Sequence, residues 1–270
     1  MMAATRRREA GDAVPELTFT TPFAVFSDVH GNLPALEAVL ADIDRRGLPV
    51  VCLGDLVGYG PWPDEVAALV RERRIPCLMG NYDRGIGFAT GDCGCVYRTD
   101  AQRAEGAASL AFTEARVSEE TRAFLRSLAD RFVIHTPNGE VLAVHGSPRR
   151  INEYLFADRP DSSLARLAAQ GPWRAILFGH THQPWARDVA RPGDGGRTLF
   201  VNVGSAGRPR DGDWRACYAV LDPSRLAEGP AAVAFARVPY DYGRLQEALA
   251  RTSLITKFTS PHEGAPADDD

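Results

Sequence analysis

Six short polar motifs, nearly all starting where an apolar run ends, constrain the fold of this chain more than any other feature. They are Ser-Asp-Val-His-Gly-Asn (27–32), Leu-Gly-Asp-Leu-Val-Gly (53–58), Met-Gly-Asn-Tyr-Asp (79–83), Ala-Val-His-Gly-Ser-Pro (143–148), Phe-Gly-His-Thr-His (178–182) and Asn-Val-Gly-Ser-Ala-Gly (202–207). Short continuous apolar runs are typical of strands covered on both faces. Ligands of open α/β sheets bind at the carboxyl ends of strands, so the motifs predict one shared site there.

The order of the predicted elements indicates the fold class. Residues 23–27 and 50–53 are predicted strands, and residues 33–43 between them a helix capped by Asn32, with Pro34 in its first turn. Further helices are predicted at 63–73, 101–113, 119–129, 162–169 and 242–251, and further strands at 76–79, 132–135, 141–144, 175–178, 185–190, 198–201, 216–221 and 232–238. An Asn-Gly turn makes 132–144 a hairpin. We therefore predict an α/β fold, an αββα sandwich of two mixed β-sheets flanked by helices.

The length of 270 residues suits one domain. We place this domain at residues 21–258, after a flexible N-terminal arm at 1–20 and before a disordered tail at 259–270. Between about 85 and 106 the pattern breaks into Gly, Asp, Cys and Thr. This stretch is therefore predicted to be an insertion that acts as a lid.

Composition limits the choice of partners. The formal net charge of −4 gives no general attraction to nucleic acid or to an anionic membrane. No run approaches the roughly 18 apolar residues of a membrane helix. Five cysteines, an odd number, fit a reducing compartment better than a disulfide framework. We expect a cytoplasmic protein that forms no stable nucleic-acid complex and whose partner is a nucleotide rather than a long polymer.

Seven residues of the motifs carry metal-binding side chains. Asp28 and His30 are two residues apart, as are His180 and His182, so on extended segments each pair would point to one face. The set is two carboxylates, one amide oxygen and four imidazoles, from Asp28, His30, Asp55, Asn81, His145, His180 and His182. Mixed oxygen and nitrogen ligands suit Mn, Fe, Zn, Ni or Co better than Mg or Ca. We expect two divalent or trivalent transition-metal ions, with manganese placed first.

The ligand set also predicts a reaction. Asp55 sits on the strand between the two ligand groups, so it is the candidate for a carboxylate that bridges two metals, with one oxygen on each. Two metals about 3.5–4 Å apart can hold a bridging hydroxide and stabilise the attacking and leaving oxygens of a displacement at phosphorus. Hydrolysis of phosphate esters is the reaction that this arrangement suits, so we expect a small phosphorylated substrate.

These six motifs in this order, from Ser27 to Gly207, resemble those of the calcineurin-like metallophosphoesterases, in particular the small single-domain bacterial and archaeal group. The 202–212 stretch is similar to that group's own signature. The resemblance implies a first metal held by Asp28, His30, Asp55 and His182. It implies a second metal held by Asp55, Asn81, His145 and His180.

Tyr82 departs from the family pattern. Many members carry histidine directly after the ligand asparagine, where it protonates the leaving group or braces the phosphate. A tyrosine with a reference pKa near 10 is a poor acid at pH 7. We therefore expect phosphodiester or phosphoanhydride substrates, whose leaving groups need little protonation. Tyr82 either donates a proton, stacks on a base or only walls the pocket.

Other candidates flank the ligands. Asp83 is included among the catalytic candidates with Asp55, Asn81, His145 and Tyr82; it either hydrogen-bonds a ligand histidine or caps the following helix. Asn32 is expected to cap a helix and also face the site. The candidate phosphate-binding residues are Arg149, Arg150, Arg208 and Arg210, with a solvated rim as the alternative. Cys93 and Cys95 are expected to be ordinary free cysteines, because no second pair completes a tetrahedral metal site.

Two other functions compete with a dinuclear phosphoesterase acting through a metal-bridging hydroxide. A serine/threonine protein phosphatase or general phosphomonoesterase would want a broad open groove and usually the missing histidine. A non-catalytic protein-binding scaffold would have lost metal ligands, and here all seven are present.

Overall fold

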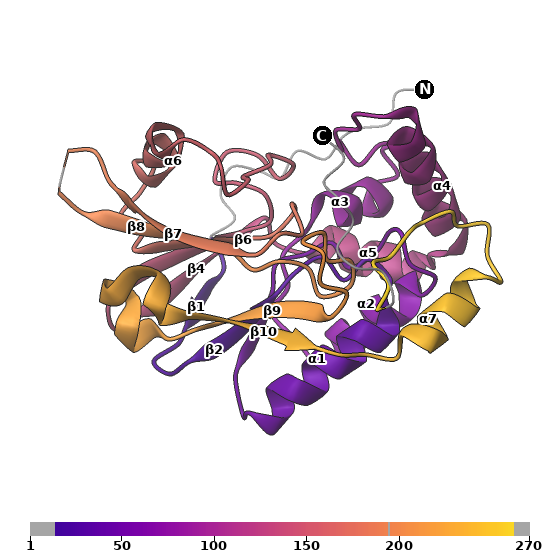
Figure 1. Ribbon diagram of the computed structural model, residues 1–270, viewed down its shortest axis with the longest axis horizontal. Coiled ribbons are helices and arrows are strands. Elements are labelled where there is room, and N and C mark those ends of the chain that lie inside the picture. The colour runs from indigo at the N-terminus through magenta and orange to yellow at the C-terminus, as the bar shows by residue number, and fades with distance from the viewer. Residues whose placement is uncertain (1–13, 194, 262–270) are drawn as a thin grey trace.

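Two stacked β-sheets form the centre of the molecule (Figure 1). The computed structural model describes residues 14–193 and 195–261. The six-stranded sheet runs in the order β1 (Glu16–Thr18), β4 (Arg131–Thr136), β5 (Gly139–Val144), β6 (Ala175–Phe178), β8 (Arg197–Asn202) and β7 (Trp185–Ala190). The four-stranded sheet runs in the order β10 (Val233–Val238), β9 (Ala216–Leu221), β2 (Phe23–Phe26) and β3 (Val50–Cys52). Each contains parallel and antiparallel pairs, which confirms two mixed sheets.

Helices cover both outer faces of this sandwich (Figure 1). Helix α1 (Leu33–Arg45) lies on the four-stranded sheet, with α2 (Pro63–Glu72) and α7 (Tyr242–Leu249) beside it. Helix α6 (Asp161–Ala168) covers the other sheet. Three helices gather at one end: α3 (Asn81–Gly87), α4 (Asp100–Arg116) and α5 (Glu119–Ser127). A 3-10 segment, Pro223–Ala232, joins β9 to β10. The predicted αββα architecture is confirmed.

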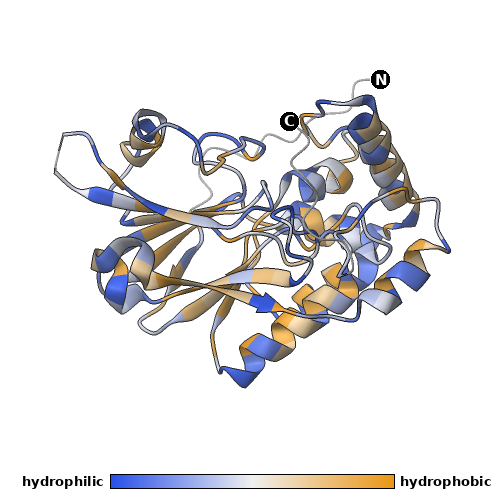
Figure 2. Ribbon diagram, viewed as in Figure 1, coloured by the Kyte–Doolittle hydropathy of each residue, from blue (hydrophilic) through white to orange (hydrophobic). Residues whose placement is uncertain are grey.

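Strands buried on both faces explain the continuous apolar runs. In β2, Phe23 and Val25 point into the core between the sheets, whereas Phe26 points toward the helices. In β6, Leu177 points between the sheets and Phe178 toward α6. Figure 2 shows apolar residues concentrated in the two sheets and along α1. The buried strand ends hold the loops after them in place.

Part of the predicted flexible arm is ordered. Residues Glu16–Thr18 pair in parallel with β4, with Glu16 opposite Val133. Leu17 and Phe19 pack against the core between the sheets, and this burial fixes a segment that the sequence did not mark as a strand. The rest of the predicted arm, up to residue 13, and the predicted tail beyond residue 261 lie outside the described residues.

Two local predictions were wrong, and the predicted hairpin forms with other turn residues than Asn-Gly. The segment 76–79 forms only isolated bridges, from Cys77 to Cys52 and from Leu78 to Ala129, rather than a full strand. The hairpin turns at Pro137 and Asn138, since Thr136 pairs with Gly139, which takes a φ of +111°. The irregular part of the predicted lid is shorter than 85–106: α3 continues to residue 87 and α4 starts at residue 100.

Within 14–193 and 195–261, no helix is both long and apolar enough to cross a membrane.

Candidate metal centre

Five predicted ligands lie just after strand ends, in the left-handed backbone conformation. Their φ angles are 56° at Asp28, 50° at His30, 56° at Asp55, 67° at His180 and 62° at His182. This conformation is uncommon for residues other than glycine and clusters at functional sites. The expected extended segments are absent at these positions, because β2 ends at residue 26 and β6 at residue 178. Tight turns, rather than strand alternation, bring the paired ligands to one face.

Two motif glycines make room for the carboxylates. A Cβ atom at Gly80 would lie 2.0 Å from Asp55 Oδ1, and one at Gly179 would lie 2.4 Å from Asp28 Oδ2. Any larger residue would displace a carboxylate. The close approach explains why glycine directly precedes Asn81 and His180 in the sequence.

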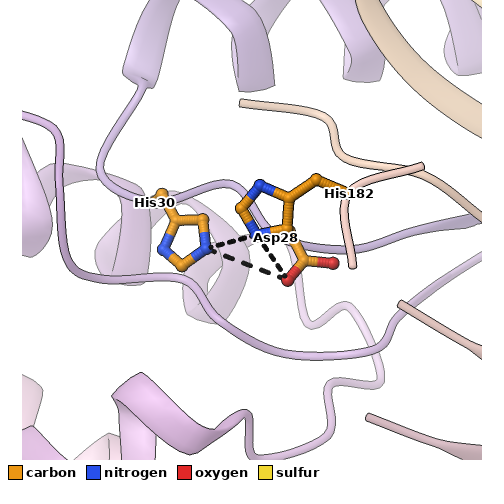
Figure 3. Close-up of side chains that lie close together, drawn as sticks. All are labelled: Asp28, His30 and His182. Carbon is orange, nitrogen blue, oxygen red and sulfur yellow. Dashed lines mark hydrogen bonds and ion pairs between the residues drawn. The ribbon is translucent and has the colours of Figure 1, made fainter. Parts of the chain in front are cut away.

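Asp28, His30 and His182 form the first ligand group (Figure 3). The Nε2 atoms of the two histidines are 3.1 Å apart, and His182 Nε2 lies 3.4 Å from Asp28 Oδ1. His30 Nδ1 donates to the Val57 carbonyl at 3.0 Å, and His182 Nδ1 to the Arg208 carbonyl at 2.7 Å. Because a carbonyl only accepts, Nδ1 carries the proton and each Nε2 presents a lone pair. Two imidazole lone pairs that converge beside a carboxylate form a site that can bind a cation.

Asp55, His145 and His180 form the second group. His145 Nδ1 donates to the Leu53 carbonyl at 2.9 Å, which again leaves Nε2 for a metal. That Nε2 lies 3.3 Å from Asp55 Oδ2 and 3.0 Å from Asn81 Oδ1. The amide oxygen of Asn81 therefore faces the same point as the carboxylate and the imidazoles.

Asp55 lies between the groups. Its Oδ2 is 3.6 Å from His30 Nε2 of the first group and 3.3 Å from His145 Nε2 of the second. Its Oδ1 accepts the backbone N–H of Tyr82 at 2.8 Å. One oxygen, rather than one for each metal as predicted, faces both groups.

The two ligand groups are buried and contain polar atoms without hydrogen-bond partners, and both properties suit the binding of metal cations. Asp28 Oδ1 and His180 Nε2 are buried without a hydrogen-bond partner, which is unfavourable unless a bound ion completes them. Burial lowers the pKa of His30 and of His180 to about 3, so both imidazoles stay neutral. Burial opposes ionisation of Asp28 as well, but the surrounding imidazoles hold its pKa below the ordinary value. Burial likewise opposes the charge on His145, yet Asp55 raises its pKa to about 10.

A small cavity of about 40 Å³ opens above the two groups. The sequence reasoning missed part of its lining: Tyr59, Val96, Tyr97, Gln102, Glu105 and Tyr154. Tyr59 directly follows the motif at 53–58, which could have indicated it, whereas Tyr154 stands in a loop with no pattern. The ring of Tyr154 lies 4.1 Å from that of His180. The polar lining, which includes Arg210, suits an anionic group.

Tyr82 and Asp83 follow the ligand Asn81 on α3. The Tyr82 ring meets His30 edge-on at 5.3 Å, and its buried hydroxyl makes no hydrogen bond of ordinary geometry. Burial raises the pKa of this hydroxyl well above its usual value. Asp83 accepts from the backbone N–H groups of Asp55 at 2.8 Å, Leu56 at 2.9 Å and Gly80 at 2.9 Å. It therefore positions the Asp55 loop and hydrogen-bonds none of the ligand histidines.

The predicted substrate-binding residues separate in space. Asn32 is buried; its Oδ1 accepts from the Ala35 N–H in capping α1, and its Nδ2 donates to the Gly207 carbonyl at 2.7 Å. Arg149 pairs with Glu153 on the surface, and Arg150 is exposed. Of the predicted set only Arg210 lines the cavity.

Arg208 is buried beside the cavity. Its guanidinium lies 4.1 Å above the Tyr59 ring and 2.5 Å from the Glu105 carboxylate of α4. Burial lowers the pKa of Arg208, although Glu105 opposes this. The ion pair joins α4 to the loop after β8, whose Arg208 carbonyl accepts from His182.

A family model and two solved structures match this architecture. The model of the calcineurin-like phosphoesterase superfamily domain matches residues 22–225. The protein MJ0912 of Methanocaldococcus jannaschii is 32% identical over 86% of this chain and 93% of its own length. The crystal structure of a metallophosphoesterase from Sphaerobacter thermophilus has a TM-score of 0.66 at 31% identity, over 85% of this chain and 93% of that one.

The structure of the protein PH1004 from Pyrococcus horikoshii has the same fold, with a TM-score of 0.69 at 24% identity over 86% of this chain and 94% of that one. The family match includes every residue of the two ligand groups. The chain belongs to the calcineurin-like phosphoesterase superfamily.

Proposed function

We propose that the protein is a dinuclear metal-dependent phosphoesterase that hydrolyses phosphodiester or phosphoanhydride bonds of small, nucleotide-like substrates. The observation that carries the proposal is Asp55 Oδ2, which lies between two complete ligand groups at 3.6 Å and 3.3 Å from their imidazoles. When bound, two transition metals supply an activated water and neutralise phosphate charge. The residues that would hold them are the seven predicted ligands, with manganese proposed first.

The lack of an efficient proton donor for the leaving group supports phosphodiester and phosphoanhydride substrates. The Tyr82 hydroxyl is buried with a raised pKa, so it is a poor proton donor at neutral pH. Aryl alcohols and nucleoside phosphates leave without protonation more readily than alkyl alcohols do. Arg210 at the cavity supplies a cation for a phosphate oxygen.

The cavity disfavours a protein substrate. Residues 95–105 cover the ligands and leave about 40 Å³, whereas a phosphoprotein phosphatase needs an open groove. The same segment supports the proposed lid, because its side chains line the cavity beside the ligands. A non-catalytic scaffold is also disfavoured, since each ligand of the two groups is in place. We propose a cytoplasmic location from the odd number of cysteines.

The test is reconstitution of metal-free protein with Mn, Fe, Zn, Ni, Co or Mg. Each form is assayed against bis-p-nitrophenyl phosphate, p-nitrophenyl phosphate, cyclic nucleotides and dinucleoside polyphosphates. We expect metal-dependent hydrolysis with diesters or anhydrides above monoesters. Hydrolysis of p-nitrophenyl phosphate alone would contradict the proposed substrate class, and no hydrolysis with any metal would contradict the activity.

A further inference from the structure

We propose that Cys93 and Cys95 form a redox modification site: a peroxide converts the two thiols into a disulfide, and this loosens the metal ligand Asn81. The inference rests on the proposed metal centre and adds a regulation of it. It departs from the expectation of ordinary free cysteines, because the structure places the thiols together and against a ligand.

The two thiols lie close enough to form a disulfide after a small movement. Their Sγ atoms lie 3.0 Å apart, whereas a disulfide requires about 2.05 Å. Gly94 between them has a φ of +68°, a left-handed turn that puts both side chains on one side of the loop. The turn is fixed because the Gly94 N–H donates to Asp92 Oδ1 at 2.8 Å and its carbonyl accepts from Asn152 Nδ2 at 2.9 Å.

The same pair holds the side-chain amide of Asn81. Asn81 Nδ2 donates to the Cys93 carbonyl at 2.9 Å and to Cys95 Sγ at 3.3 Å. Because the nitrogen end is held there, Oδ1 points to His145 Nε2, 3.0 Å away. Partners that orient a ligand in this way contribute about 10–100-fold to metal affinity. A disulfide draws Cys95 Sγ toward Cys93 and moves the turn that carries the Cys93 carbonyl.

A small oxidant can reach this pair through Cys95, whereas Cys93 beside it and the other three thiols are buried. Cys95 lines the cavity above the metal ligands and is only half-buried. Cys52, Cys77 and Cys217 are buried in the strands and loops of the core. Buried thiols in apolar surroundings are inert.

The reaction balances with a peroxide as the oxidant. One thiolate attacks a peroxide oxygen, the O–O bond breaks, and the sulfur becomes a sulfenic acid while water or an alcohol leaves. The second thiol attacks that sulfur, the S–O bond breaks, and water leaves as the S–S bond forms. The two sulfurs give up two electrons and two protons to the peroxide. A dithiol reverses the change by thiol–disulfide exchange.

The test uses full-length, reduced protein loaded with a redox-inert metal, zinc, and treated with hydrogen peroxide. Intact mass and peptide mapping read the thiols, and elemental analysis after desalting reads the metal. We expect loss of the mass of two hydrogen atoms in the 93–95 peptide. We also expect weaker binding of one of two metal equivalents, by about 10–100-fold, restored by dithiothreitol.

Variants separate this site from other effects of the oxidant. In the Cys93→Ser/Cys95→Ser protein the Cys93 carbonyl still accepts from Asn81, and its metal affinity, measured before and after treatment, should not change with the oxidant, whereas Cys217→Ala should respond like the wild type. The proposal is overturned if no 93–95 disulfide forms, if it forms without a change in metal binding, or if the double variant loses metal equally. These readouts need no substrate, so a protein that responds as expected but hydrolyses no phosphoester would count against the proposed function alone.

Discussion

Asp55 is the residue on which both ligand groups depend. Its Oδ2 faces an imidazole of each group, and its Oδ1 is held by the Tyr82 amide. In Asp55→Asn one of these positions becomes an NH₂ group, which cannot bind a metal. We expect hydrolysis to fall by at least the roughly 10²–10³-fold of losing one group that stabilises the transition state. Elemental analysis should show weaker binding at both positions.

Asp158→Asn is the matched control for this change. Asp158 is an exposed carboxylate on a loop outside the cavity lining. It should keep both metals and the wild-type rate. Two tightly bound metals in Asp55→Asn would contradict a shared ligand.

Tyr82 allows a second prediction at a single position. With no efficient acid there, the charge on the departing oxygen depends on metal or solvent, so the rate should depend strongly on leaving-group pKa. Tyr82→His should accelerate poor leaving groups more than good ones, by about 10²-fold at the low end of general-acid contributions. The measurement is a series of aryl and alkyl phosphodiesters on both proteins at equal metal occupancy.

Tyr82→Phe tests the hydroxyl itself. The hydroxyl is buried and makes no hydrogen bond of ordinary geometry, so its removal should leave the dependence on leaving-group pKa unchanged. A steeper dependence in Tyr82→Phe would show that the tyrosine protonates the leaving group after all. A flat dependence in the wild type would place the acid elsewhere.

An ion pair between Glu105 and Arg208 connects helix α4 to the loop after β8. Glu105 accepts from Arg208 Nη2 at 2.5 Å and from the Lys257 backbone N–H at 3.0 Å. Breaking a fully buried ion pair lowers the free energy of unfolding by roughly 3–5 kcal/mol. The loss should be smaller here, because the Glu105 side chain is 18% exposed. Glu105→Gln should therefore lower the free energy of unfolding by about 2 kcal/mol. Denaturant unfolding measures this change.

Glu228→Gln is the matched control for Glu105→Gln. It breaks the pair with Arg225 on the 3-10 segment, where both side chains are about half exposed. Exposed pairs contribute little, so the unfolding midpoint should stay close to that of the wild type. Equal effects of the two variants would show that the Glu105 pair does not hold α4.

The elements also show how far the sequence predicts this molecule. Strands such as β2 and β6 are buried on both faces, so their apolar runs mark them, and the ligands follow directly. The strand β1 was missed because its few residues are fixed by pairing with β4, a contact distant in sequence. The ligand turns were misread as extended, since their left-handed angles depend on contacts such as the His30 N–H to the Asp55 carbonyl at 3.0 Å.

The cavity lining was less predictable for the same reason. Tyr97 and Glu105 reach the cavity only because residues 88–116 fold back over the ligands. No local sequence pattern indicates that this segment folds back over the ligands. The pairing of Arg208 with Glu105 likewise joins residues far apart in the chain.

The metal ligands come from both sheets, which makes the proposed centre a link across the whole molecule. Asp28, His30 and Asp55 follow strands of the four-stranded sheet, whereas His145 and the pair at 180 and 182 follow strands of the six-stranded sheet. A ligand that binds only the folded state stabilises it by about 2.7 kcal/mol at 100 times its dissociation constant. Removal of metals with a chelator should therefore lower Tm by roughly 5–10 °C. Calorimetry of the metal-free and reconstituted protein measures the shift.

Asp55→Asn distinguishes a link between the sheets from a general effect of the chelator. With both positions weakened, its Tm should respond little to chelation, while Asp158→Asn should lose as much as the wild type does. The metal-free wild type should remain folded, because Asp55 then pairs with His145, whose pKa it raises to about 10, and the core between the sheets is independent of the site. A Tm that is equal with and without metals would show that the two sheets are held together by their apolar core alone.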